Sequence, residues 1–429
     1  MIDRLTDQQI SAVLSRALKT KNLIDKNDSS IIFHDLSFMK QKVHNLIELF
    51  PVDTLHAIPV KANPLQKILR KLEALGVGSE AASMPELHLA INAGFPSERI
   101  VFNSPTKTRE ELEYALMVGV HINADSLPEL ERIETILQGK QTQSTLGIRI
   151  NPQVGTGTIL STSVAGDYSK FGVPLNEHRK ELMDCYLRYN WLNGVHVHIG
   201  SQGCKVELLL NGIERVLGFV EEVNDFLRLS GIPRQINLID IGGGLPVSYH
   251  SDQQAVSLSG YKTKLSQSFP KLFSARFKLI TEFGRCMYVN AGWVASRVEY
   301  VKSGSVNTAM IHVGADLFLR ECYNPQDWNH EIIVADSAGK LKIGLDDYKY
   351  IIAGPLCFAG DIIAREIELP RVEVGDFVII KDTGAYTLGM WSRYNSRQIP
   401  KVIGYYEGGI EFETLKEREK IDDILRFWE

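Results

Sequence analysis

The chain has 429 residues, of which 44% are apolar and 23% charged, so it can bury a large core and is too long for one ordinary compact domain. A net charge of −5 leaves no excess of positive charge for phosphates, which argues against nucleic acid as a partner. The five widely spaced cysteines fit neither a disulfide framework nor a CxxC zinc site, so we expect a reducing cytoplasm. The sequence has no run of about 18 apolar residues and no secretory h-region, which disfavours membrane spanning and secretion.

Short apolar runs alternate with amphipathic helical segments from Thr54 to Arg285. The helical segments include Thr108–Val118 and Ser126–Leu137, the second with Ser126 as N-cap and Glu129 at capping-box spacing. Repeated β-then-α units pair in parallel with right-handed crossovers, and eight of them close into a (β/α)8 TIM barrel. The predicted strands cover residues 54–60, 77–82, 99–103, 120–125, 145–151, 192–199, 236–241 and 277–282.

Beyond about residue 286, β-rich runs follow one another through Gly, Asp and Pro turns, which predicts an antiparallel C-terminal domain, a β-sandwich or β-barrel. Ser30–His34 is expected to add a strand to it, and Thr414–Phe427 is expected to be a surface helix. The predicted fold class is therefore α/β in two domains. The barrel takes residues 36–285, and the β-rich domain takes residues 1–35 and 286–429.

Four of the predicted barrel strands end in chemically active residues, and active sites in such barrels lie at these strand ends. Lys61 follows the first strand, where an amine is well placed to form an imine with an aldehyde. Gly242–Gly244 follows the seventh strand and lets backbone N–H groups approach an anion, although it is not a GxGxxG fingerprint. Glu282 and Arg285 follow the eighth. Each feature alone has an ordinary structural explanation, and their joint occurrence favours a site.

His196 and His198 end the sixth strand and share one of its faces because side chains alternate along a strand. Zinc would need at least a third ligand, which the sequence does not show. We therefore predict no metal.

These strand ends, together with motifs further along, resemble the fold-type III pyridoxal-5′-phosphate (PLP) decarboxylases, the family of diaminopimelate, ornithine and arginine decarboxylases. The likeness is greatest to the diaminopimelate branch and covers nearly the whole chain. The motifs that carry it are Val60–Asn63, Lys170–Gly172, His196–Gln202, Asp240–Gly244, Glu282–Arg285, Gly354–Cys357, Gly384–Tyr386 and Ser392–Arg397.

The resemblance implies that Lys61 holds PLP as a Schiff base, that His198 lies against the ring and that Glu282 faces the pyridine nitrogen. An anion there keeps that nitrogen protonated, so that the ring can accept the electron pair left by CO2. Racemases of the same fold place an arginine at this nitrogen, so Glu282 favours decarboxylation. The other implied cofactor-binding residues are Ser201, Gly243, Gly244, Gly284, Arg285 and Tyr386.

Cys357 resembles the family's cysteine that crosses from the partner subunit and protonates the carbanion, which implies a homodimer with shared active sites. The next residue is Phe358, where the diaminopimelate branch carries Glu and ornithine decarboxylases carry Asp for the distal amino group. Phe358 cannot form that ion pair. The implied substrate contacts are Arg320, Tyr323, Phe358 and Asp361.

Four functions remain open from the sequence. The first is decarboxylation of diaminopimelate or a related diamino acid. The second is decarboxylation of a citryl-, acyl- or carrier-linked amino acid in siderophore or antibiotic biosynthesis, which Phe358 suggests. A non-catalytic binding homologue and a racemase are the others, and the presence of Lys61, His198, Glu282 and Cys357 together disfavours the binding homologue.

Overall fold

The computed structural model describes residues 4–343 and 347–429 and divides into two compact units. The barrel unit comprises Lys42–Val247 and Gln254–Cys286, and the β-rich unit takes its described residues from Met1–Gln41, Ser248–Gln253 and Met287–Glu429. The short segment Ser248–Gln253 joins the β-rich unit through contacts such as the 2.7 Å hydrogen bond from the Ser251 N–H to Glu331. The domain boundaries expected from the sequence stay a prediction about which parts fold independently.

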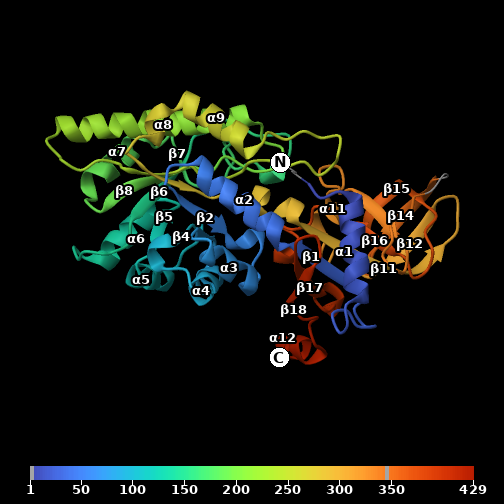
Figure 1. Ribbon diagram of the computed structural model, residues 1–429. Coiled ribbons are helices and arrows are strands. Elements are labelled where there is room, and N and C mark those ends of the chain that lie inside the picture. Colours follow the sequence, from blue (N-terminus) through green and yellow to red (C-terminus); the bar gives the residue numbers. More distant parts are fainter. Residues whose placement is uncertain (1–3, 344–346) are drawn as a thin grey trace. The chain divides into compact units, whose positions relative to one another are not determined.

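Eight parallel strands close the barrel, in the order β5-β4-β3-β2-β10-β9-β8-β6 with β6 pairing back onto β5 (Figure 1). All eight predicted strands are present, so the predicted barrel is confirmed. Their bounds are β2 Leu55–Pro59, β3 Gly78–Ala81, β4 Ile100–Phe102, β5 His121–Ala124, β6 Leu146–Asn151, β8 Leu192–His196, β9 Leu238–Asp240 and β10 Lys278–Thr281. A two-residue strand, β7 (Val173–Pro174), pairs in parallel with the last residues of β6.

Helices alternate with the barrel strands along the chain, as the sequence periodicity predicts. They are α2 Leu36–Leu49, α3 Gln66–Ala74, α4 Met84–Ala93, α5 Arg109–Val118, α6 Leu127–Leu137, α7 Arg179–Arg188, α8 Val206–Leu229 and α9 Leu258–Ser268. Helix α5 begins with a capping box in which Thr108 and Glu111 each accept the other's backbone N–H.

The capping box predicted for α6 is wrong. Ser126 occupies the N-cap position, but its side chain makes no capping hydrogen bond. Glu129 is drawn instead to the fully buried ammonium of Lys107, 2.7 Å away, and accepts the backbone N–H of Asp125. A buried cation without its carboxylate would be costly, and this outweighs the gain from a capping hydrogen bond.

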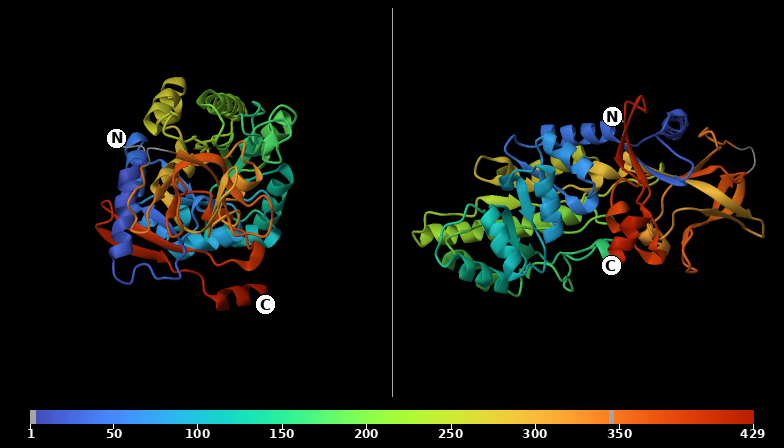
Figure 2. Two further views of the ribbon diagram at one scale, coloured as in Figure 1. Left: turned by 90° about the vertical axis from the view of Figure 1, so that its right-hand side faces the viewer. Right: turned by 90° about the horizontal axis from the view of Figure 1, so that it is seen from below.

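The β-rich unit contains a mixed sheet, so the antiparallel arrangement expected from the sequence holds for most of its strand pairs but is wrong for two of them. β1 pairs in parallel with β17, and β12 pairs in parallel with β14. Period-2 patterning identifies strands but does not fix the direction of their partners, and β1 comes from the other end of the chain. The strands are β1 Ser30–Asp35, β11 Gly292–Lys302, β12 Asn307–Ile311, β13 Ile332–Ala335, β14 Asp347–Ala353, β15 Ile362–Pro370, β16 Phe377–Ile380, β17 Lys401–Tyr406 and β18 Glu411–Lys416 (Figure 2).

Helix α1 (Asp7–Lys19) packs its apolar face on this sheet and forms the core of the β-rich unit with it. At its centre the rings of Phe33 and Trp293 stack with centroids 4.0 Å apart, and the Trp293 indole N–H donates to the Tyr405 hydroxyl at 3.1 Å. β1 therefore supplies a central strand, as the sequence predicts for Ser30–His34.

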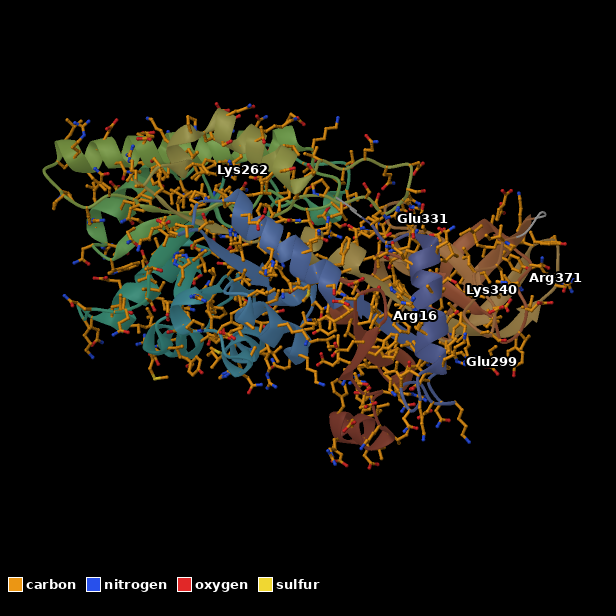
Figure 3. All side chains as sticks on the ribbon, in the orientation of Figure 1. Arg16, Lys262, Glu299, Glu331, Lys340 and Arg371 are labelled. Carbon is orange, nitrogen blue, oxygen red and sulfur yellow. The ribbon has the colours of Figure 1, made fainter. Side chains whose placement is uncertain are left out.

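The predicted C-terminal helix at Thr414–Phe427 is partly wrong. β18 occupies the first residues of that segment and pairs with β17, and helix α12 begins only at Ile421 and ends at Trp428. Alternating charged and apolar residues in Glu411–Lys416 fit a half-exposed edge strand as well as a helix. Over the described residues, no helix combines the length and apolarity that a membrane span requires. Charged side chains of both signs lie on the surface, including the labelled Arg16, Glu299 and Lys340 (Figure 3).

Candidate active site

Lys61 lies just after strand β2, in a single 3-10 turn, Val60–Ala62. Its Nζ donates to Glu80 Oε2 at 2.5 Å. Glu80 belongs to the neighbouring strand β3 and is fully buried, whereas the Lys61 side chain is 44% exposed. The carboxylate thus fixes the amine at the strand end while leaving it accessible to a ligand.

Glu282 follows strand β10 and lies close to a second buried acid, Asp240 at the end of β9. Burial raises the pKa of Glu282 well above its ordinary value, the negative charges of Asp240 and Glu80 raise it further, and Lys61 opposes them. Burial also raises the pKa of Asp240, to about 6. A cation or a protonated ring nitrogen beside Glu282 would offset the burial and the neighbouring negative charges, and so stabilise the ionised carboxylate.

Both strand-end histidines lie at the same place as Glu282. His196, His198 and Glu282 each have one ligand-capable atom within 4.8 Å of the others, so the third partner that the sequence does not show is present in space. The Gly243 N–H donates to His198 Nδ1 at 3.2 Å, and burial lowers the pKa of His198 to about 3. His198 is therefore a neutral ring with Nδ1 as acceptor. Two of these three side chains, His198 and Glu282, are those assigned to the cofactor by resemblance, and we propose no metal.

The three glycines after β9 allow a close approach of backbone segments. A Cβ at Gly243 would lie 2.1 Å from the Glu282 carbonyl oxygen, and one at Gly244 would lie 2.1 Å from that of Gly200. Beside them, Arg285 Nε donates to the Ser201 hydroxyl at 3.1 Å. A buried arginine, a hydroxyl and side-chain-free backbone form a suitable cradle for a phosphate.

Cys357 lies on an exposed loop of the β-rich unit that is fixed by side chains of the following segment. Its N–H donates to Asn395 Oδ1 at 2.7 Å, and the Tyr394 hydroxyl donates to its carbonyl at 3.2 Å. Beneath the loop, the buried Asp361 accepts the N–H groups of Ala315 at 2.6 Å and Leu356 at 2.5 Å. Asp361 therefore anchors the loop that presents the thiol.

The side chains around Cys357 are mainly aromatic. Phe358 stacks on Tyr323 with ring centroids 5.3 Å apart, and Tyr394 meets Phe358 edge-on at 6.3 Å. The Arg320 guanidinium lies 5.3 Å from the ring centre of Tyr386, whose backbone φ of 58° is in the left-handed region. Of the four substrate contacts expected from the sequence, Tyr323 and Phe358 therefore stack on each other beside Cys357, Arg320 lies over Tyr386, and Asp361 is buried.

The residues of the barrel unit fit an aldehyde cofactor that carries a phosphate. They supply an amine at Lys61, an acid at Glu282 and an anion cradle at the glycines, while both ring nitrogens of the buried His196 lack a hydrogen-bond partner. The expected set divides between the units. Lys61, His198, Ser201, Gly243, Gly244, Glu282, Gly284 and Arg285 belong to the barrel unit, and Arg320, Tyr323, Cys357, Phe358, Asp361 and Tyr386 belong to the β-rich unit.

Sequence reasoning missed several polar residues at this end of the barrel. Glu80, Asp240 and Arg149 all interact electrostatically with Glu282 and are buried. Each lies at or near the carboxyl end of a barrel strand, so examining all eight strand ends in the same way would have found them.

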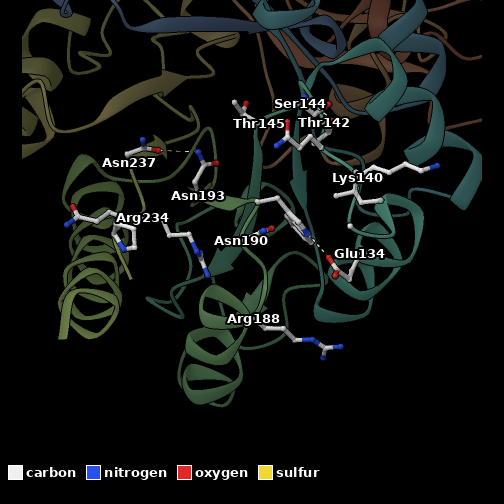
Figure 4. Close-up of a pocket in the computed structure, with 16 residues that line it drawn as sticks. Glu134, Lys140, Thr142, Ser144, Thr145, Arg188, Asn190, Asn193, Arg234 and Asn237 are labelled. Atoms are coloured by element: carbon white, nitrogen blue, oxygen red, sulfur yellow. Dashed lines mark hydrogen bonds between the residues drawn. The ribbon is translucent and has the colours of Figure 1, made fainter. Parts of the chain in front are cut away.

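A cavity of about 800 Å³ lies elsewhere in the barrel unit and includes none of these residues. The loops that precede β6, β8 and β9 line it, which places it at the amino ends of the strands (Figure 4). Its walls are polar and include the hydrogen-bonded pair Asn193 and Asn237, 3.3 Å apart, and Thr145. This cavity therefore lies away from the strand ends that carry Lys61 and Glu282.

Comparison with known proteins gives consistent matches. Residues 36–289 match the family model described as "Pyridoxal-dependent decarboxylase, pyridoxal binding domain". Diaminopimelate decarboxylase of Pseudomonas aeruginosa is 32% identical over 376 residues, covering 85% of this chain and 84% of that protein. The crystal structure of diaminopimelate decarboxylase from Helicobacter pylori complexed with L-lysine is similar with a TM-score of 0.81 at 28% identity, covering 94% of this chain and 97% of that one. The M. jannaschii enzyme in co-complex with L-lysine also has a TM-score of 0.81 at 28% identity, covering 96% and 93%.

Proposed function

This chain belongs to the fold-type III pyridoxal-dependent decarboxylases, and from that membership we propose that it removes CO2 from diaminopimelate or a closely related diamino acid. The family, the barrel fold and the requirement for PLP that the motifs imply are thereby confirmed. The chain is a PLP-dependent carboxy-lyase. The matches do not favour a citryl-, acyl- or carrier-linked substrate or a non-catalytic homologue.

One observation carries the proposal: an amine and a buried acid meet at the carboxyl ends of adjacent strands β2 and β10. PLP, when bound, supplies a ring that takes up the electron pair left by departing CO2. In our proposal Lys61 holds the aldehyde carbon. Ser201, Gly243, Gly244, Gly284, Arg285 and Tyr386 bind the phosphate end.

Glu282 holds a proton on the pyridine nitrogen in this scheme, because a buried carboxylate is most stable beside a positive charge. The neutral ring of His198 would lie against the cofactor ring and help to hold it in place. Glu80 positions the amine of Lys61 through their 2.5 Å hydrogen bond. These roles rest on the resemblance and on the contacts described above.

Cys357 delivers the proton to Cα after CO2 has left. Its exposure on a loop fits a thiol that enters the site of a second subunit, so we propose a homodimer with shared active sites. A thiol with this role has to stay reduced, which supports a cytoplasmic location.

Arg320, Tyr323 and Phe358 contact the distal part of the substrate in this proposal, and Asp361 acts through the loop that it anchors. Phe358 lies between two tyrosine rings and offers no charge to a distal ammonium. Ring faces attract cations more weakly than a carboxylate does, so we expect only modest discrimination at this end of the substrate.

The test is release of labelled CO2 from carboxyl-labelled meso-diaminopimelate by the PLP-loaded protein, with ornithine and an N-acylated diamino acid in parallel. Equal amounts of CO2 and lysine from diaminopimelate support the proposal. Turnover of the acylated compound alone would contradict the substrate assignment, and no CO2 from any of them would contradict the reaction.

A further inference from the structure

A continuous chain of hydrogen-bonded polar side chains, buried except for its first member, runs through the barrel and ends on Glu282. It begins at Thr145, directly before strand β6, and passes through His121 and Asn123 of β5 to Asn103, directly after β4. Because the strands are parallel, Thr145 and His121 lie at their amino ends and Glu282 at their carboxyl ends.

The hydrogen bonds of this chain all point the same way. Asn123 Oδ1 can only accept, so His121 Nε2 donates to it at 3.0 Å. Burial lowers the pKa of His121 to about 4, so its ring is neutral and Nδ1 accepts from the Thr145 hydroxyl at 2.8 Å. Asn123 Nδ2 then donates to Asn103 Oδ1 at 2.9 Å, and Asn103 Nδ2 donates to Glu282 Oε1.

Asn123 also serves the second acid of the site. Its Nδ2 donates to Asp240 Oδ2 at 3.0 Å, while Asp240 Oδ1 accepts the Gly242 N–H at 2.9 Å. Each of the two buried carboxyl groups therefore receives one donor from the chain. Donors aligned in series polarise one another, so each strengthens the next.

The backbone leaves space for this arrangement. Gly147 lies within strand β6, where glycine is ordinarily unfavourable, and a Cβ there would lie 2.4 Å from Asn123 Oδ1. A larger residue would displace the central amide of the chain. The polar network thus costs the sheet a packing contact, which a network serving only to fill the core would not require.

We propose that Thr145, His121, Asn123 and Asn103 are positioning residues that hold an oriented donor on Glu282 and so set its charge from the opposite end of the barrel. The proposal rests on the proposed function only for the role of Glu282. The charged and titratable groups that face this carboxyl are Asp240, Glu80, Lys61, Arg149, His196 and His198.

The chain also reaches solvent at its far end. Thr145 is exposed and lines the cavity of about 800 Å³ at the amino ends of the strands. The first donor of the chain can therefore be replaced without disturbing the core.

The experiment follows the titration of Glu282 by 13C NMR of protein labelled in its glutamate carboxyl groups, with and without PLP, using Glu282→Gln to assign the signal. Asn103→Leu removes the donor itself and is expected to raise the midpoint by about one to two pH units. His121→Phe acts two hydrogen bonds further away and should raise it less. Thr145→Val, which keeps the shape and removes the hydroxyl, should raise the Glu282 midpoint by a few tenths of a unit. Thr145→Ser keeps the hydroxyl and should leave the midpoint at its unaltered value.

A shift of the Glu282 midpoint that becomes smaller with distance from Glu282, and that is absent in Thr145→Ser, distinguishes a relay from a packing role. By relay we mean the hydrogen-bonded chain that holds the donor on Glu282. An unchanged Glu282 midpoint in Thr145→Val and His121→Phe, with a lower melting temperature, would overturn the proposal. Thr135→Val on the exposed surface of α6 is the matched control, since the Thr135 hydroxyl only donates to the Glu131 carbonyl. Should Asn103→Leu fail to fold, the Thr145 pair still decides.

The titration is independent of turnover. If no variant, nor the unaltered protein, releases CO2 from any amino acid, the proposed function fails while the Glu282 shifts still test the relay. If CO2 release is normal and the shifts are absent, only the relay fails.

Discussion

Two regions share the proposed chemistry, and they are built in opposite ways. At the barrel strand ends Glu80, Asp240 and Glu282 are buried together, so each charge acts strongly on the others. Around Cys357 the thiol is exposed and its neighbours are rings and amides. A buried cluster can control protonation, whereas an exposed thiol on an anchored loop can be presented to another molecule.

Replacing the central acid of the buried region should have the largest effect. Glu282→Gln keeps the shape but removes the charge that holds the pyridine nitrogen protonated, so we expect turnover to fall at least about a hundredfold, roughly 2.7 kcal/mol. PLP should still bind, as judged by its visible absorbance. Near-normal turnover would show that this charge is not required.

The exposed region predicts complementation between subunits. Lys61→Ala and Cys357→Ala should each be inactive alone, and after random exchange half of the dimers contain one intact composite site, giving about a quarter of the unaltered activity. Mixing two preparations of Lys61→Ala is the control. If mass measurement confirms exchange and no activity returns, both residues act within one subunit.

A charge placed beside the thiol would make the two regions more alike. Phe358→Glu should lower the KM for free meso-diaminopimelate several-fold with little change in kcat, because a carboxylate then meets the distal ammonium. Phe358→Gln is the uncharged control. An equal change in both variants would assign the effect to lost ring packing.

Buried histidines in the barrel predict acid sensitivity. Burial lowers the pKa of His56 to about 4 and that of His198 to about 3. The folded form therefore resists protons that the unfolded chain takes up near pH 6.5, and the free energy of unfolding should fall as the pH drops from about 6.5 towards 4, by up to about 1.4 kcal/mol per unit per histidine. The free energy of unfolding, measured by urea denaturation at several pH values, should depend less steeply on pH in His56→Gln than in His88→Gln, the control at an exposed histidine. Equal slopes would contradict this.

The sequence predicts the barrel well because its apolar runs and helical segments alternate regularly, and eight such β-α units are the number that closes a barrel. It also predicts the strand-end residues Lys61, His198 and Glu282. It does not predict the direction of pairing of β1 with β17, because β1 and β17 come from opposite ends of the chain and the alternation of apolar residues is the same in both directions.

The polar chain behind Glu282 was also beyond the sequence. Asn103 and Asn123 look like ordinary strand-end residues, and only the stacking of side chains from β4, β5 and β9 in space brings them together. The capping box of α6 failed for a related reason, since Glu129 pairs with the buried Lys107. Long-range electrostatic pairing outweighs local sequence patterns where charges are buried.

The most direct test of the account is to locate the covalent bond between the protein and PLP. Borohydride reduction of the PLP-loaded protein, followed by proteolysis and mass spectrometry, should place the pyridoxyl group on Lys61, and Lys61→Ala should lose both the label and the visible absorbance of the bound cofactor. A label on a different lysine, or an unchanged spectrum in Lys61→Ala, would contradict the assignment of the site.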